Sequence, residues 1–119
     1  MITQQQLTEK CTPEIIKKMC ELAEGFCYSR DGWFYNGNNG FTIYNNIGFP
    51  LLIHRAVEGF NKKDVEYQIR VDGDEVYIPT WELGESSCKY FKKATDYQPT
   101  TLTHVECAIL DCLIDILKG

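Results

Sequence analysis

The chain has 119 residues, of which 44% are hydrophobic and 24% are charged, and its formal net charge is −5. This length suits one ordinary domain, which buries most of its unfolded surface without needing a metal or disulfide staple. The composition argues against a disordered chain, so we expect a single domain over residues 1–119.

The negative charge is concentrated in the second half of the chain. Residues 1–63 carry seven Lys or Arg and six Asp or Glu, whereas residues 64–119 carry five and eleven. Between Asp64 and Glu85, seven carboxylates stand against one cation, Arg70. Such a field repels phosphates, so we expect no direct contact with nucleic acid at this face.

The sequence predicts neither an export signal nor a membrane span. The segment MITQQQLTEKC has no apolar core, and no later run approaches the roughly 18 apolar residues that cross a bilayer. The expected location is the cytoplasm. The cysteines are irregularly spaced and are predicted to be reduced thiols. They are Cys11, Cys20, Cys27, Cys88, Cys107 and Cys112.

Two helix starts are signalled near the beginning of the chain. Thr3 followed by Gln6 fits a capping box and predicts a short helical turn. The hydroxyl of Thr12, followed directly by proline, predicts a helix over residues 13–24.

The stretch from Phe26 to Phe49 holds eight of the fifteen aromatic residues. Asn, Gly and Asp-Gly punctuate it, and these residues tolerate the positive φ of tight turns. We therefore predict a meander of three short strands, near residues 26–29, 33–36 and 41–44.

A second helix is predicted from Pro50 to about Asn61. Gly59 is unfavourable inside a helix, so it indicates either close backbone packing or an early helix end.

The clearest strand signal lies in residues 65–71, where apolar and polar side chains alternate. Residues 72–74 turn the chain, and the alternation resumes at residues 76–78. We therefore predict a hairpin with one buried face. Residues 84–101 are poorly patterned, and 86–94 fits a short helix or a strand.

The last helix is signalled by Thr103 and Glu106, which form a second capping box before a broad apolar face. Cys107 and Cys112 fall among these apolar residues, where free cysteine acts as a small hydrophobe. A solvated stripe is predicted on the opposite side. Its members are His104, Asp111, Asp115 and Lys118.

The order helix, strand meander, helix, hairpin, helix favours a compact α+β domain with an antiparallel β-sheet and about three α-helices. Helices on both faces of that sheet would make an αβα sandwich. The layout of the second helix, the hairpin and HVECAILDCLIDIL resembles small phage-encoded αβα sandwich proteins. TPEIIKKMCELAEGF is similar to small phage or prophage reading frames. The resemblance implies a phage or mobile-element origin, and hence the cytoplasm of a bacterial host as the location, and it carries over no functional residue.

The sequence contains no catalytic, metal or cofactor signature. Zinc ligands commonly occur as CxxC or HxxxH pairs, and neither spacing is present. A nucleophilic cysteine needs an imidazole beside it. His54 and His104 are the two histidines, and Cys27 and Cys88 lie outside the helix stripes. We therefore predict no catalytic residue, no metal and no cofactor.

The leading functional hypothesis is a non-enzymatic accessory protein that binds and inhibits a host, phage or defence protein. A basic, nucleic-acid-binding partner would suit the acidic hairpin. The predicted contact residues lie on this hairpin and its adjoining aromatic surface. They are Asp72, Asp74, Glu75, Trp81 and Glu82.

Two other function classes remain open. The first is a small-ligand-binding or sequestering protein that uses Trp33, Tyr35 and Tyr44, because aromatic side chains are enriched at binding sites. The second is a small cysteine-dependent enzyme.

Overall fold

The computed structural model describes residues 1–82 and 85–118. The helices are α1 (Gln4–Lys10), α2 (Pro13–Leu22), α3 (Gly48–Lys63), the 3-10 helix η1 (Ala94–Asp96) and α4 (His104–Lys118). The strands are β1 (Ile2–Thr3), β2 (Phe26–Tyr28), β3 (Phe34–Asn36), β4 (Asn39–Phe41), β5 (Arg70–Asp72), β6 (Glu75–Glu82), β7 (Glu85–Lys93) and β8 (Tyr97–Gln98). Within the described residues, no helix has both the length and the apolar character needed to cross a membrane.

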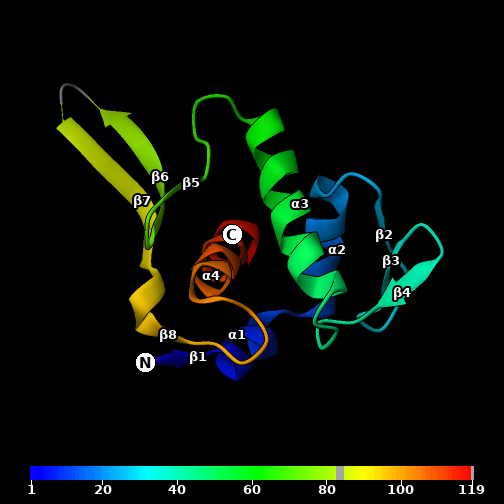
Figure 1. The fold of residues 1–119 in the computed structure, drawn as a ribbon. Coiled ribbons are helices and arrows are strands. Elements are labelled where there is room, and N and C mark those ends of the chain that lie inside the picture. The colour runs from blue at the N-terminus through cyan, green and yellow to red at the C-terminus, as the bar shows by residue number, and fades with distance from the viewer. Residues whose placement is uncertain (83–84, 119) are drawn as a thin grey trace.

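The strands form three separate sheets. β2, β3 and β4 make one antiparallel sheet, β5, β6 and β7 make another, and β1 pairs with β8 in a short parallel ladder. Figure 1 shows the helices between the two antiparallel sheets, with β5–β7 on one side of them and β2–β4 on the other. The α+β class predicted from the sequence is confirmed, but the strands flank the helices and do not form one sheet covered by them.

Helix α4 lies at the centre of the molecule (Figure 1). It contacts α1, α2, α3 and the strands β6 and β7. Residues 107–114 are buried without interruption, so this stretch of α4 is enclosed on every side, including the side that carries Asp111. Cys107 and Cys112 are buried in it as predicted, and the capping box of Thr103 and Glu106 is present.

The N-terminal segment fixes the chain just before α4. The capping box of Thr3 and Gln6 starts α1, as predicted. The side-chain oxygen of the buried Gln4 then accepts hydrogen bonds from the backbone N–H groups of residues 100–102, at 2.8, 3.0 and 3.0 Å. Consecutive N–H groups that converge in this way form a nest for an acceptor. Gln4 therefore ties α1 to the turn that leads into α4.

The prediction of a strand over residues 65–71 is wrong for most of its length. Only residues 70–72 pair as β5, and Val65 is 82% exposed. The carboxylate of Asp64 accepts hydrogen bonds from the N–H groups of Glu66 and Tyr67, at 3.0 and 2.9 Å. Such local bonds compete with a strand ladder for the backbone. The second half of the predicted hairpin is confirmed, since Val76 and Ile78 are buried.

Gly59 lies where α3 packs directly against the last residue of α2. A Cβ atom at this position would overlap the backbone carbonyl oxygen of Leu22. The helix continues to Lys63, so close backbone packing is confirmed and an early helix end is not.

Gly59→Ala is therefore expected to destabilise the protein by about 1–3 kcal/mol, because overpacking against backbone outweighs the gain in helix propensity of about 1 kcal/mol. Urea unfolding measures the change. Glu58→Ala, at the exposed neighbouring position, is the matched control and should leave the midpoint nearly unchanged. An unchanged or raised midpoint for Gly59→Ala would contradict the assigned helix contact.

Candidate functional site

The second antiparallel sheet extends away from the helices as an arm (Figure 1). We call residues 70–82 and 85–93 the β-arm. Its base is the β5–β6 turn, where the carbonyl of Asp74 accepts a hydrogen bond from the N–H of Ala94 at 2.6 Å. From there β6 and β7 pair out to Glu82 and Glu85. The β-arm therefore has a base held by the body of the protein and an end that projects from it.

The two faces of the β-arm differ in their surroundings. Val76, Ile78 and Thr80 point to the inner face and are buried. Side chains alternate between faces along a strand, so Tyr77 and Pro79 belong to the outer face. On that face the rings of Tyr77 and Phe91 are stacked, with centroids 6.2 Å apart. Phe91 is 43% exposed, so we call Tyr77, Pro79 and Phe91 the aromatic face.

A β-bulge in β7 determines which residues face inward. Val76 pairs with Lys92 and Ile78 pairs with Lys89, so Tyr77 lies opposite two residues, Tyr90 and Phe91. Tyr90 has φ +52°, a left-handed conformation that is uncommon for a bulky side chain. Bulges of this kind redirect side chains. Here Phe91 remains on the outer face and Lys92 points to α4.

A buried polar network joins the β-arm to α4. The hydroxyl of Tyr97 donates to Asp111 Oδ2 at 2.5 Å. Lys92 Nζ lies 2.6 Å from Asp115 Oδ2 and 3.5 Å from Asp111 Oδ2. Lys118 Nζ reaches the other oxygen of Asp115 at 3.2 Å. We call Lys92, Tyr97, Asp111 and Asp115 the anchor network.

The pKa shifts of these groups follow from burial and from the close charges. Burial raises the pKa of Tyr97, and the hydrogen bond to Asp111 raises it further. Burial alone would lower the pKa of Lys92, but the hydrogen bond to Asp115 and the charges of both aspartates outweigh it and raise that pKa. Burial alone would raise the pKa of Asp115, but Lys92 and Lys118 outweigh it and lower that pKa. The pair of Lys92 and Asp115 is therefore held in its charged form.

Asp111 corrects a prediction made from the sequence. It is 2% exposed and does not lie on a solvated stripe. Asp115 is half-buried, whereas His104 and Lys118 are exposed as predicted. The reason is that β7 and η1 cover the side of α4 that the helical pattern leaves polar. The helical pattern of α4 carries no signal for this burial, because Asp111 shares its side of the helix with His104, Asp115 and Lys118.

The five predicted partner-binding residues all belong to the β-arm but do not form one patch. Asp72 and Asp74 are exposed at its base, and Glu75 is half-buried there. Trp81 lies six residues along β6 from Glu75, or roughly 20 Å for an extended strand. The side chains of Trp81 and Glu82 lie outside the described part of the structure.

The charge around the acidic turn is more balanced than the sequence indicates. Lys93 pairs in register with Glu75, and Arg70 lies two residues before Asp72 on β5. Lys89 lies on the same sheet, with its Nζ 6.0 Å from the ring centroid of Tyr67. These cations come from strands that lie beside β6, so the acidic run of the sequence becomes a surface of mixed charge.

The residues of the predicted ligand site are divided between two surfaces. Trp33 is 46% exposed and Tyr35 lies beyond it on the outer face of β2–β4. The ring of Tyr35 covers Gly40, since a Cβ atom there would lie 2.7 Å from it. Tyr44 lines a hollow of about 240 Å³ beside α1. The structure therefore brings Trp33 and Tyr35 together but not Tyr44.

The cysteines and histidines do not form a nucleophilic pair in the described part of the chain. His54 Nε2 lies 2.8 Å from Glu106 Oε2, and neither histidine hydrogen-bonds to a cysteine there. Burial raises the pKa of Cys11 and Cys112 to about 12, which disfavours the reactive thiolate. All six thiols are free, and Cys27 and Cys88 are exposed.

Comparison with known proteins finds no match for this chain. No protein-family model matches it, and no match was found among the curated proteins or the solved structures. The function must therefore be argued from the geometry of the site.

Removal of the buried charge should destabilise the protein. Asp111→Asn keeps an oxygen that accepts the hydrogen bond of Tyr97, but it removes one of the two negative charges beside Lys92. We therefore expect the free energy of unfolding to fall by about 2 kcal/mol. Thermal and urea unfolding measure it. Asp96→Asn makes the same change at an exposed site one residue from Tyr97 and should cost under about 0.5 kcal/mol. Equal stability of the two variants would contradict the role assigned to the anchor network.

The anchor network also predicts a dependence on pH. The folded-state pKa of Asp115 is lower than its ordinary value of about 3.9. Its contribution to stability is therefore full above about pH 4 and is lost as the pH falls through the folded-state pKa. We expect urea midpoints to drop less between pH 5 and pH 2.5 in Asp115→Asn than in the wild type. Asp72→Asn, an exposed carboxylate, should keep the wild-type drop, and identical drops in all three proteins would contradict this account.

Proposed function

We propose that the chain is a non-enzymatic protein-binding module that contacts its partner through the aromatic face of the β-arm. The observation that carries the proposal is the exposed Phe91, stacked on Tyr77 on a sheet that projects from the body of the protein. Protein contacts are enriched in tyrosine, phenylalanine and arginine at their centres.

The surroundings of the aromatic face match the anatomy of a protein interface. Arg70 is the cross-strand neighbour of Tyr77, and it is exposed. Toward the base the same face carries Asp72, Glu75 and Lys93, whose charges are of both signs. Interfaces typically place apolar side chains at the centre and polar side chains at the rim. An aromatic centre with a rim of mixed charge favours a partner whose contact surface also has an apolar centre and charges of both signs around it.

The anchor network gives this surface its rigidity. Lys92 is the residue next to Phe91, and its ammonium group is held between two carboxylates of α4. The aromatic face is therefore fixed in position before a partner arrives. Preorganisation of this kind raises affinity, because less conformational freedom is lost on binding.

The acidic turn at Asp72, Asp74 and Glu75 takes a secondary role in this proposal. It lies at the edge of the aromatic face, and charges at the rim chiefly control the rate of encounter and its salt dependence. A phage or mobile-element origin, a host or defence protein as the partner, and inhibition as the outcome stay predictions from the sequence. The proposal that the aromatic face binds a partner does not depend on these three predictions.

The ligand-binding alternative is less well supported. Tyr44 lies apart from Trp33 and Tyr35, and the ring of Tyr35 is already in contact with Gly40. Ligand sites commonly surround most of their ligand with converging side chains. Two aromatic residues on the outer face of a small sheet do not provide such an enclosure.

Substitution at Phe91 tests the proposal. A photocrosslinking amino acid at this position should capture the partner in a lysate of the native host, and mass spectrometry then identifies it. With the purified partner, Phe91→Ala should weaken binding by about 2 kcal/mol, or roughly 30-fold, with little change in the circular dichroism spectrum. Tyr44→Ala removes an exposed aromatic ring from another surface and is the matched control.

Two outcomes would count against the aromatic face. Binding that is unaffected by Phe91→Ala but lost in Trp33→Ala would move the contact to the meander. Reversal of Asp72, Asp74 and Glu75 to lysine should slow association and leave dissociation nearly unchanged. A large increase in the dissociation rate would instead assign the contact to the acidic turn.

A further inference from the structure

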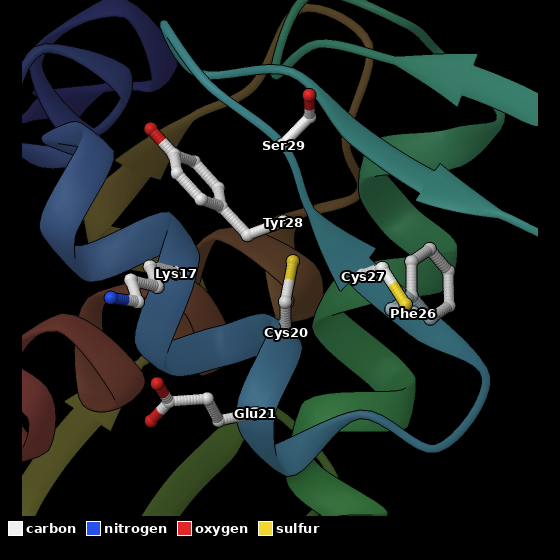
Figure 2. A pocket seen from close by; sticks show the side chains of 7 residues that line it. All are labelled: Lys17, Cys20, Glu21, Phe26, Cys27, Tyr28 and Ser29. Carbon is white, nitrogen blue, oxygen red and sulfur yellow. The ribbon is translucent and has the colours of Figure 1, made fainter.

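A groove on the side of the molecule away from the β-arm lies between α2 and β2. Its volume is about 510 Å³. Figure 2 shows the side chains that line it: Lys17, Cys20 and Glu21 on α2, and Phe26, Cys27, Tyr28 and Ser29 on the strand and just beyond it. A helix on one side and a strand on the other thus form its walls.

The strand wall of this groove is an unpaired sheet edge. The order of the sheet is β2–β3–β4, so β2 pairs on one side only. The N–H of Ser29 donates to the carbonyl of Trp33, at 2.9 Å. Hydrogen-bonded and non-hydrogen-bonded pairs alternate along an antiparallel ladder. Ser29 is hydrogen-bonded to the residue before β3, so the next hydrogen-bonded pair is Cys27 with Tyr35. The backbone N–H and C=O of Tyr28, which lies between them, therefore point away from β3. Outside the helices and the strand ladders, the backbone hydrogen bonds of the described residues include none to the N–H or C=O of Tyr28.

The β3–β4 pairing gives the same assignment independently. Asn36 and Asn39 flank a two-residue turn and pair in register, which makes them a bonded pair. Phe34 and Phe41 then form the next hydrogen-bonded pair of this ladder. The backbone of Tyr35, between Phe34 and Asn36, therefore points the other way and hydrogen-bonds with β2. Both ladders therefore leave the C=O of Phe26 and both backbone groups of Tyr28 on the free edge.

The helix wall supplies charges of opposite sign. Lys17 and Glu21 are exposed and lie one helical turn apart, so they occupy the same side of α2. Between them the buried Cys20 and, across the groove, the buried Phe26 provide an apolar floor. A ligand that lies along the strand would meet a cation and an anion in succession.

We propose that this groove binds an extended peptide segment of another protein, which adds to the free edge of β2 as a fourth strand. The unpaired groups of Phe26 and Tyr28 are spaced for a strand backbone, and a peptide in extended form presents the matching donors and acceptors. An acidic side chain of the peptide faces Lys17, and a basic one faces Glu21. The site is distinct from the aromatic face and does not depend on its function.

Selection from a displayed library of random linear decapeptides on the full chain provides the probe. The enriched peptides are then synthesised with single N-methyl groups along their length. Because alternate N–H groups of an added strand point to β2, methylation should weaken binding more than tenfold at alternate positions and little at those between. Hydrogen exchange of the Tyr28 amide should slow on binding, whereas that of Cys27 should change little.

Charge variants test the helix wall. Lys17→Glu and Glu21→Lys should each weaken the selected peptides about three- to tenfold. The double exchange should prefer a peptide whose two charges are swapped. Lys10→Glu, on α1 and outside the groove, is the matched control and should bind like the wild type. Circular dichroism checks that each variant keeps its fold.

Three results would overturn the proposal. The first is the absence of any enriched peptide. The second is an enriched peptide whose affinity depends on Phe91 and is unchanged by the charge variants, since it would bind the β-arm. The third is a concentration-dependent dimer in sedimentation that Lys17→Glu abolishes, because the groove would then be filled by a second copy of the chain.

Discussion

The burial of the middle of α4 is the constraint on which the rest of the structure depends. Its residues 107–114 are all buried, so other elements have to cover every side of this stretch. α1, α2 and α3 cover it together with β6 and β7. A carboxylate in such a helix is costly unless it is paired and hydrogen-bonded. Asp111 therefore requires Tyr97 and Lys92, and these two residues bring β8 and the β-arm onto the helix.

The capped helices were predictable from the sequence because their signals are local. Thr12, Thr103 and the box at Thr3 each act within three or four residues of their own position. Asp111 and residues 65–71 were mispredicted for the opposite reason. The burial of Asp111 depends on its ion pair with Lys92, nineteen residues earlier in the sequence. The irregular backbone of residues 65–71 depends on hydrogen bonds to the side chains of Asn61 and Asp64. Asn61 accepts from the N–H of Ile69 at 2.7 Å, in place of a strand partner.

In the candidate sites, too, local features could be predicted from the sequence and features that depend on distant contacts could not. The acidic residues of the β-arm could be identified from composition and turn signals alone. The aromatic pair of Tyr77 and Phe91 could not, because its position depends on the pairing of β7, a segment without a clear pattern. The bulge at Tyr90 aligns Phe91 with Tyr77 and Lys92 with Val76. The same strand pairing places Lys93 opposite Glu75 of the acidic turn.

The two outer strands next to the proposed sites differ in how they would receive another chain. β7 carries Lys89, Lys92 and Lys93 as well as a bulge, and both features discourage pairing with a further strand. β2 has neither between Phe26 and Tyr28, and its free edge opens into a groove. A partner at the β-arm would therefore be held by side chains on the outer face, whereas a partner at β2 would be held through its backbone. Because the two proposed surfaces lie on opposite sides of the helices, the two proposals together predict that one chain can join two different proteins.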